Sequence, residues 1–369
     1  MKRQLSCFLL FFVVASILGC QKGDTGKDPD PQPSEMKTDA GYTFSLVLKP
    51  DRSLWSAGEN LQGQLGSGTF TNRNSFLKIT EGVSDISAGA FHTLVLKTDQ
   101  TLWACGNNFY GQLGDGTFTN RNSLVKIADN VKAIGAGSYH SMVIKNDNSL
   151  WVCGNNEFGR LGDGTIISRN VLKKVADDVK LISGGSDHSL IVKSDNSLWA
   201  CGGNAIGQLG DGTTNPSLVF KKIMENVSSV SAGYLYTMIV KNDNSLWACG
   251  INNNETLGTG NNNNQYALIN ITNNVKSVHA GWNHTFILKA HNSLWARGTN
   301  SQGQYGNGTY VGSSVFLKIS DNIKQVSVGS NHSLVVKTDG TVWSCGLNND
   351  GQLGNGGNTN SPILVPVSL

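Results

Sequence analysis

Charged side chains are scarce in this sequence. Asp, Glu, Lys and Arg make up 15% of the 369 residues, and 29 basic against 26 acidic residues leave a formal net charge of only +3. A surface that binds nucleic acid needs a strong basic excess. Composition therefore argues against a nucleic-acid partner, the more so because Lys2 and Arg3 lie in a segment that we expect to be removed.

Proline is also scarce, at 7 residues, whereas glycine reaches 44 residues and hydrophobic residues 38%. This balance excludes a disordered chain, which would be poor in apolar residues. It also differs from the composition of a helical protein, because glycine is unfavourable inside helices. The totals favour an all-β protein with many turns.

Long apolar runs are nearly absent as well. The run at residues 5–18 is too short and wrongly flanked for a membrane-spanning helix. It ends in the string ILGC, which resembles the lipobox of bacterial lipoproteins, although Leu18 stands where a small residue is usual. The resemblance implies a signal peptide over residues 1–19 and lipid attachment to the thiol of Cys20. An ordinary cleaved secretory signal is the alternative.

The residues after this cysteine predict the membrane that would hold the anchor and the linker that would join it to the rest of the chain. Gln21 in place of Asp implies, by analogy with diderm bacteria, the outer membrane, and leaves open which side the protein faces. Residues 20–33 are polar and contain three prolines, so they cannot build a core and are interpreted as a tether.

Tryptophan reveals an internal repeat. Seven of the eight tryptophans recur with a constant period of 48, namely Trp55, Trp103, Trp151, Trp199, Trp247, Trp295 and Trp343. Seven frames of this period, counted back from the C-terminus, fill residues 34–369 without a gap. A fixed period of this size indicates a repeat architecture.

One frame, residues 82–129, shows the local pattern. A weakly alternating segment at 83–87 and an apolar run at 92–97 are followed by a turn, a strand at 101–105, a glycine-punctuated loop and a strand at 123–127. Four short strands per unit, repeated seven times, are typical of a β-propeller. A buried tryptophan removes about 150–250 Å² from water, so each blade gains a strong packing contact with its neighbour.

The strings AGAFHTLVLK, LWACGNN and GQLGDGT resemble the repeat of the regulator of chromosome condensation family, over residues 40–369. The resemblance implies a seven-bladed propeller. Frame one starts weakly, and frame five departs most, with Tyr236 at the His position and ETLG in place of GQLG. We predict an all-β, seven-bladed propeller of four-stranded blades at residues 34–369. The rival fold, a sialidase-like propeller with Asp boxes, fits residues 194–199 only faintly.

Several residue types recur once per frame and are interpreted as scaffold. The five cysteines of the repeat should be buried, unpaired core residues, because packed sheets lie about 10 Å apart and a disulfide needs Cα atoms within about 7 Å. They are Cys105, Cys153, Cys201, Cys249 and Cys345. The histidine ladder predicts a repeated hydrogen bond between backbone segments rather than a metal site. It consists of His92, His140, His188, His284 and His332, with Phe44 and Tyr236 in the two remaining frames.

Two further sets are basic. One lysine per frame precedes a hairpin turn and is interpreted as a turn residue, not as part of a ligand ring; the seven are Lys49, Lys97, Lys145, Lys193, Lys241, Lys289 and Lys337. Arg73, Arg121 and Arg169 occupy equivalent loop positions in frames one to three. This row either binds an anionic partner or is a remnant of duplication.

The candidate site comes from positions that do not repeat. The two residues between AG and the His position vary from frame to frame and should share one face of the ring. Aromatic residues are the usual anchors of protein interfaces. We therefore expect a partner-binding face formed by Tyr42, Phe91, Tyr139, Tyr234, Trp282, Asp187, Asn283 and Asn331.

The function that these observations favour is a binding or scaffold module, lipid-anchored at the cell envelope, that recognises a protein partner. We expect a monomer that is not an enzyme and that needs no metal or cofactor, because the acidic residues mostly repeat and no unique pair of carboxylates stands out. A glycan-binding, lectin-like protein, a glycan-active enzyme and a passive surface spacer are the alternatives. We also expect the strand at residues 363–367 to close the ring by sharing a blade with the N-terminal strand.

Overall fold

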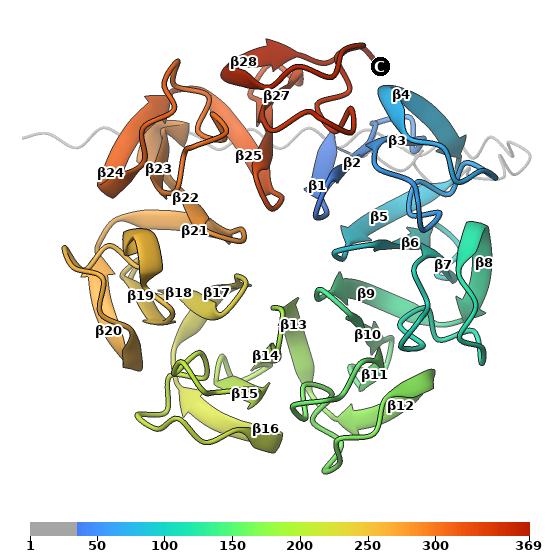
Figure 1. Cartoon of the computed structure of the whole chain (residues 1–369). Coiled ribbons are helices and arrows are strands. Elements are labelled where there is room, and N and C mark those ends of the chain that lie inside the picture. The colour runs from blue at the N-terminus through green and yellow to red at the C-terminus, as the bar shows by residue number, and fades with distance from the viewer. Residues whose placement is uncertain (1–34) are drawn as a thin grey trace, which may run out of the picture. The chain divides into compact units, whose positions relative to one another are not determined.

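The computed structural model describes residues 35–369. The predicted signal peptide, the lipid-attachment residue Cys20, the tether and Ser34 lie outside the described residues. The described part of the chain forms seven four-stranded antiparallel sheets arranged around an axis (Figure 1), each built from consecutive strands. The prediction of an all-β, seven-bladed propeller of four-stranded blades is confirmed.

The strands follow the chain blade by blade. Blade 1 contains β1 (Lys37–Ala40), β2 (Phe44–Leu48), β3 (Leu54–Gly58) and β4 (Arg73–Thr80). Blade 2 contains β5 (Val83–Ala88), β6 (His92–Lys97), β7 (Leu102–Gly106) and β8 (Arg121–Ala128). Blade 3 contains β9 (Val131–Ala136), β10 (His140–Lys145), β11 (Leu150–Gly154) and β12 (Arg169–Ala176). Blade 4 contains β13 (Val179–Gly184), β14 (His188–Lys193), β15 (Leu198–Gly202) and β16 (Ser217–Met224).

The last three blades add two short 3₁₀ turns. Blade 5 contains β17 (Val227–Ala232), β18 (Tyr236–Lys241), β19 (Leu246–Gly250), η1 (Asn253–Glu255) and β20 (Gln265–Thr272). Blade 6 contains β21 (Val275–Ala280), β22 (His284–Lys289), η2 (Ala290–Asn292), β23 (Leu294–Gly298) and β24 (Ser313–Ser320). Blade 7 contains β25 (Ile323–Val328), β26 (His332–Lys337), β27 (Val342–Gly346) and β28 (Ser361–Pro366).

The second strand of each blade is the most deeply buried. In β6 every residue from His92 to Leu96 is buried, because both faces of the strand meet a neighbouring blade. Leu94 and Leu96 point to one side and pack with Val131, Ile134 and Val143 of blade 3. An apolar run, rather than an alternating one, is what a strand covered on both faces requires. The hydrophobic core is therefore divided into layers between successive blades.

A hydrogen-bonded lock crosses the boundaries between blades. The histidines that begin the second strands are fully buried, and each Nε2 lies 2.7–3.2 Å from a Ser or Thr hydroxyl of the next blade. That hydroxyl donates its own proton to a main-chain carbonyl in the blade that carries the histidine, as Ser141 does to Gln112 at 2.6 Å. The imidazole Nε2–H must therefore be the donor to the hydroxyl oxygen. The sequence predicted that each histidine would link two backbone segments by a hydrogen bond. In the structure the histidine instead bonds to a side-chain hydroxyl, and that hydroxyl bonds to the backbone.

The glycine three residues before each of these histidines makes room for the ring. A Cβ at Gly89 would lie 2.2 Å from Cε1 of His92, and one at Gly137 would lie 2.1 Å from Cε1 of His140. Contacts that short are sterically forbidden, so the histidine and the glycine depend on each other. In blade 5, Tyr236 replaces the histidine and its hydroxyl donates to the carbonyl of His284 at 3.0 Å.

The ring does not close by sharing strands, so the expectation for its C-terminal strand is wrong. β28 pairs with β27 alone, and blade 1 has its own inner strand in β1, where Lys37 pairs with Leu48. Blade 1 therefore has no vacant strand position. The seam between blades 7 and 1 uses the same lock as four other boundaries, from His332 to Ser45 at 3.0 Å and from Ser45 to the carbonyl of Gln352 at 2.7 Å.

The recurring cysteines and lysines belong to the scaffold, as predicted. The five cysteines are buried and unpaired, and burial raises the pKa of the Cys105 and Cys153 thiols to about 12. Six of the seven lysines place Nζ 3.7–5.9 Å from the centre of the tryptophan ring of their own blade. The seventh, Lys97, donates instead to Thr80 and to the carbonyl of Glu81. These lysines stabilise the blades by cation–π contacts and hairpin hydrogen bonds.

Blade 6 breaks the cysteine ladder with Arg297, whose side chain is fully buried. None of its three guanidinium nitrogens has a hydrogen-bond partner among the described residues, although the ring of Phe316 lies 4.5 Å from Cζ. Burial lowers its pKa to about 9, so it stays protonated at neutral pH. A buried, unpaired cation is costly to the fold.

We expect the substitution Arg297→Cys, which restores the residue of the other blades, to stabilise the ring. Removing an uncompensated buried charge should gain about 2–5 kcal/mol, equivalent to a rise of several degrees in the melting temperature. Differential scanning calorimetry measures this directly. The matched control is Ala57→Cys in blade 1, which fills the same slot without removing a charge. A lower melting temperature for Arg297→Cys would contradict the assignment.

We also expect the ring to lose stability in mild acid. Burial lowers the pKa of His92, His188 and His284 to about 3, against about 6.5 in an unfolded chain. Below about pH 6.5 the unfolded state therefore binds more protons, and each such histidine costs about 1.4 kcal/mol per pH unit. Asp39, with a pKa raised to about 7, acts in the opposite direction but is a single group.

The measurement is the melting temperature between about pH 7.5 and about pH 5. The control variant is His188→Tyr, because blade 5 already uses a tyrosine at this position against a threonine of the next blade. Its stability should fall less steeply with decreasing pH than that of the wild type. A wild-type melting temperature that does not change over this range would refute the role of the buried histidines.

Candidate functional site

Two sets of loops meet on one face of the ring. The inner turns join the first and second strands of each blade and comprise residues 41–43, 89–91, 137–139, 185–187, 233–235, 281–283 and 329–331. The outer loops follow the third strands and begin at residues 59–64, 107–112, 155–160, 203–208, 251–256, 299–304 and 347–352. His92 pairs with Gly106, and Asn107 N donates to the carbonyl of Phe91 at 2.8 Å, so both sets lie at the same end of the strands.

Main-chain hydrogen bonds link the inner turns to one another. Tyr42 N donates to the carbonyl of Ala90 at 3.1 Å, and Ala90 N donates to that of Ser138 at 3.2 Å. Across the seam, Ser330 N donates to the carbonyl of Tyr42 at 3.4 Å. Each turn is thus held by its neighbours, and the side chains that it carries stand on a fixed platform.

The five aromatic residues predicted from the variable positions form one continuous cluster. Tyr139 lies 6.3 Å from Phe91, Phe91 lies 5.4 Å from Tyr42, and Tyr42 lies 4.8 Å from Trp282, all between ring centres. Trp282 and Tyr234 stack at 4.1 Å with an interplanar angle of 12°. The contact between Tyr42 of blade 1 and Trp282 of blade 6 passes over blade 7, whose turn carries only Ser330 and Asn331. We call these five residues the aromatic cluster.

The outer loops extend this cluster in a way that the sequence reasoning missed. Tyr110 packs edge-on against Tyr139 at 5.7 Å, and Phe109 packs against Tyr110 at 5.0 Å. Phe109 is 69% exposed, and Leu61 and Phe158 in the neighbouring outer loops are 61% and 42% exposed. The same comparison of frames would have found them, because the equivalents of Leu61 and Phe109 in blades 5 to 7 are Asn253, Ser301 and Asn349.

The three polar residues predicted for the face also lie in the inner turns. Among the described residues, no hydrogen bond or ion pair joins their side chains to the aromatic cluster. Asp187 forms an ion pair with Arg160 at 3.3 Å. The main-chain carbonyls of Asn283 and Asn331 accept hydrogen bonds from Thr299 N and Leu347 N, both at 2.8 Å. These backbone bonds join the inner turns to the outer loops, whatever side chains the turns carry.

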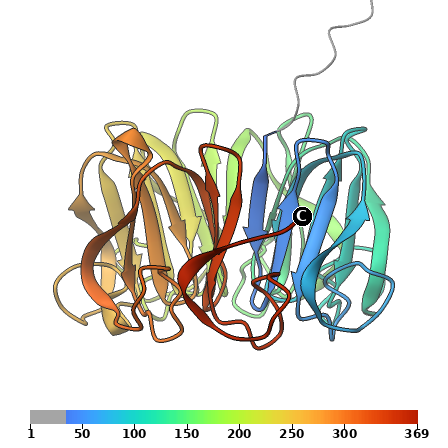
Figure 2. The same ribbon diagram turned by 90° about the horizontal axis from the view of Figure 1, so that it is seen from above.

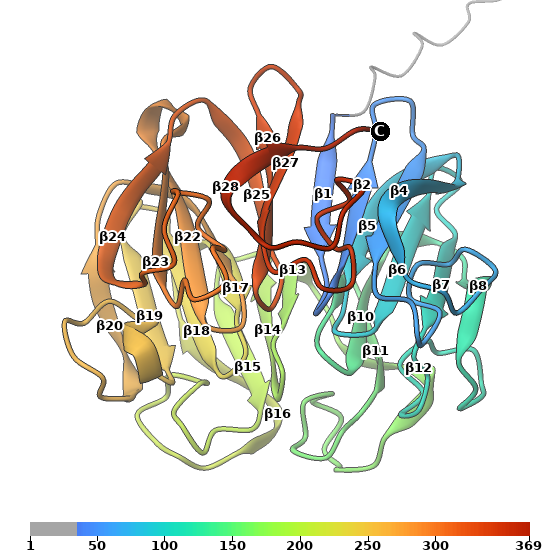
Figure 3. The same ribbon diagram turned by 45° about the horizontal axis from the view of Figure 1, so that its top comes forward.

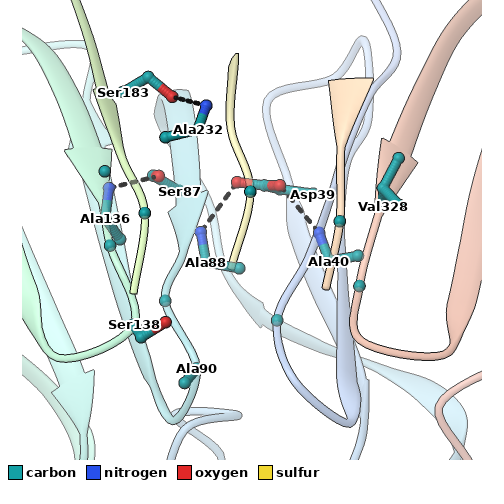
Figure 4. Close-up of a pocket in the computed structure, with 18 of the residues that line it drawn as sticks. Asp39, Ala40, Ser87, Ala88, Ala90, Ala136, Ser138, Ser183, Ala232 and Val328 are labelled. Atoms are coloured by element: carbon teal, nitrogen blue, oxygen red, sulfur yellow. Dashed lines mark hydrogen bonds between the residues drawn. The ribbon is translucent and has the colours of Figure 1, made fainter. Parts of the chain in front are cut away.

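Behind the cluster lies a central cavity of about 290 Å³, whose lining includes Tyr42, Tyr234 and Trp282. Figure 4 shows its wall, where Asp39 accepts hydrogen bonds from Ala88 N of the next blade at 2.8 Å and from Ala40 N at 2.9 Å. Blades 2, 4 and 5 use a serine for this link, as Ser87 does with Ala136 N at 3.0 Å. Burial in the cavity wall raises the pKa of Asp39 to about 7, against the lowering effect of its two backbone donors.

Two members of the arginine row are occupied by contacts within their own loops, whereas Arg73 is exposed and forms no ion pair among the described residues. Arg121 pairs with Asp115 at 2.8 Å, and Arg169 pairs with Asp163 at 2.7 Å. Hydrogen bonds from Thr165 and the pairing with Arg169 outweigh burial and lower the pKa of Asp163 well below its usual range. Of the two interpretations of this row, the pairing favours a structural role for Arg121 and Arg169.

Within residues 35–369, no group of three or more His, Cys, Asp or Glu side chains is arranged to hold a metal ion. In the same part of the chain, no helix has the length and apolar character needed to cross a membrane.

Fold and site together define a closed seven-bladed propeller whose repeats supply the scaffold and whose inner turns supply an irregular face. Two models of the regulator of chromosome condensation (RCC1) repeat match the chain, and between them they cover residues 83–208, 243–304 and 323–369. The chain therefore belongs to the RCC1 repeat family. No curated protein matches its sequence.

Solved structures of low sequence identity share the fold. Human WBSCR16 is 20% identical with a TM-score of 0.77, over 86% of this chain and 93% of that one. Yeast RCC1 (Prp20) bound to Kap60 is 17% identical with a TM-score of 0.76, over 97% and 91%. Prp20p of Saccharomyces cerevisiae, in a structure reported with its binding to Gsp1p and histones, is 18% identical with a TM-score of 0.75, over 92% and 88%.

Proposed function

We propose that this protein is a non-enzymatic binding module, held at the cell envelope, that recognises a protein partner through the face bearing the aromatic cluster. The observation that carries the proposal is the continuous contact of five aromatic side chains from five different blades. The scaffold repeats from frame to frame, but these side chains do not. Large aromatic side chains on a rigid support are typical of interface anchors, because little conformational entropy is lost when they bind.

The first described residues of the ring lie at the end opposite the aromatic cluster. Lys37 pairs with Leu48 at the end of β2 that leads to the hairpin turn, and Glu35 pairs with Lys324 at 3.0 Å. The described chain thus begins at the end of the strands opposite the inner turns. Figure 2 shows the ring edge-on. The sequence after Cys20 favours the outer membrane.

The solved relatives support a protein partner as the class of ligand. Yeast RCC1 has been solved with Kap60, and Prp20p binds Gsp1p and histones. Those partners belong to the yeast protein, and their identities are not transferred to this chain.

A hollow of about 460 Å³ supports a glycan as the second candidate ligand. It lies beside η1 and is lined by Glu255, Asn262, Asn300 and Tyr310, with Tyr310 52% exposed. An exposed aromatic ring beside amide and carboxylate groups suits the stacking and hydrogen bonding of a sugar. Binding of the ring to a glycan array, lost on Tyr310→Ser, would favour this candidate.

The partner proposal is tested by a pull-down from envelope extract of the source cell, with residues 34–369 as bait. A protein captured by the wild type should be lost when all five residues of the aromatic cluster are changed to Ser. The control is Phe118→Ser, at an exposed position (57%) outside the cluster. Circular dichroism must show that each bait is folded. Equal capture of a protein by the wild type and the five-residue variant would refute binding through this face.

The anchor is tested separately by the substitution Cys20→Ser. Growth with a labelled fatty acid should label the wild-type chain and leave the variant unlabelled, because serine has no thiol to accept the lipid. The variant should also leave the membrane fraction, since a lipoprotein's acyl chains each contribute about 0.8 kcal/mol per buried CH₂. An unlabelled, soluble wild-type protein would instead indicate an ordinary secretory signal.

A further inference from the structure

The charges on the aromatic face are unbalanced. The inner turns and the first six residues of the outer loops contain five carboxylates, namely Glu59, Glu157, Asp187, Glu255 and Asp350. The carboxylates later in the outer loops, Asp115, Asp163 and Asp211, are paired with Arg121, Arg169 and Lys221. Among the described positions of the inner turns and of those first six loop residues, one residue is basic, namely Arg160. It is 2% exposed, donates to the carbonyl of Ser186 at 2.7 Å and is paired with Asp187. Arg73, at the start of β4 on the same end of the ring, forms no ion pair among the described residues, so the other four carboxylates have no ion-pair partner there.

The opposite face is different. There, five blades pair a lysine with a carboxylate three residues later, as in Lys78 with Glu81 and Lys126 with Asp129 at 2.7 Å. The excess of negative charge is thus specific to the end of the ring that carries the aromatic cluster, although the whole chain is nearly neutral.

Two of these carboxylates meet across the seam between blades 7 and 1, next to the cluster. Glu59 accepts a hydrogen bond from Thr43, the residue after Tyr42, and Asp350 accepts one from Asn72 at 3.1 Å. Both partners are neutral. Burial and the nearby charge of Asp350 raise the pKa of Glu59. Among the described residues, neither carboxylate of the pair forms an ion pair.

At the start of the outer loops, the exposed large apolar side chains come from blades 1 to 3. Leu61, Phe109 and Phe158 project from blades 1 to 3, and Tyr110 links Phe109 to the aromatic cluster. Glu59 and Asp350 lie at one end of this crescent, and Glu157 and Asp187 lie at the other. An apolar surface flanked by carboxylates is complementary to a ligand with an apolar centre and positive ends.

Resting on the proposed function, we infer that the partner presents a basic segment to blades 1 to 3, in which Lys or Arg side chains flank a bulky apolar residue. The apolar residue packs against Phe109 and the aromatic cluster, and the basic side chains reach the carboxylates at the two ends of the crescent. Figure 3 shows the tilted ring, with blades 1 to 3 (blue to green) adjoining one another.

The test uses fluorescence anisotropy with two labelled peptides. One combines a single Trp with several Lys residues, and the other has each Lys replaced by Glu. The wild-type ring should bind the Lys peptide about tenfold more tightly than the Glu peptide, and the difference should shrink as salt is added. Equal binding of the two peptides, or tighter binding of the Glu peptide, would overturn the inference.

Substitutions inside the crescent, compared with matched substitutions outside it, show where the Lys peptide binds. Phe109→Ser and the double variant Glu59→Gln/Asp350→Asn should each weaken Lys-peptide binding about three- to tenfold. Phe118→Ser, outside the crescent, and Glu81→Gln, on the opposite face, remove the same chemical groups and should leave it unchanged. Equal losses with the controls would show that the peptide binds the ring without regard to this face, which contradicts the inference.

The envelope pull-down separates this inference from the proposed function. If the carboxylate double variant captures the partner as well as the wild type does, whereas the five-residue aromatic variant loses it, the basic segment is refuted and face binding stands. If the aromatic variant also retains the partner, the proposed function itself fails.

Discussion

The structure depends on a contact between blades, in which a buried imidazole donates to a hydroxyl of the next blade and that hydroxyl donates back to a carbonyl of the first. No blade can satisfy these groups alone, because the donor and its acceptor come from different repeats. Five of the seven boundaries are apolar layers pinned by this polar link, and an unsatisfied member would be costly there. Tyr236 makes a related link between blades 5 and 6, whereas Phe44 has no polar group to make one between blades 1 and 2. The glycine that admits the ring is part of the same constraint.

Repetition made the fold predictable. Seven tryptophans at one spacing gave the number of blades, and the apolar run at residues 92–97 identified the strand covered on both faces. Ring closure was not predictable in the same way. A strand such as β28 looks the same in sequence whether its neighbour is β27 or the N-terminal strand, and β1 was obscured by Glu35 and Thr38. Only the pairing of Lys37 with Leu48 decides between them.

The site was predicted in part. The inner turns gave the five aromatic residues because these positions vary where the scaffold repeats. Phe109 and Tyr110 were missed because they lie in the glycine-punctuated loop, to which no function was assigned. The unpaired charge of Arg297 was not predicted, because five other blades have a cysteine at this position and the sequence alone does not show that the three guanidinium nitrogens lack acceptors. Whether a buried polar group finds a hydrogen-bond partner in the next blade depends on its neighbours in space, which the spacing of residues in the sequence does not specify.

The coincidence of each blade with one uninterrupted repeat of the sequence has an evolutionary consequence. Recombination between two repeats of the gene would remove or add a complete blade, with both halves of its lock, and would never leave a blade with a missing strand. A ring closed by a shared strand tolerates such events less well, because its first and last repeats are incomplete by themselves. In this architecture a blade is also a unit of inheritance, and a binding face can change by copying one repeat and altering its two-residue turn.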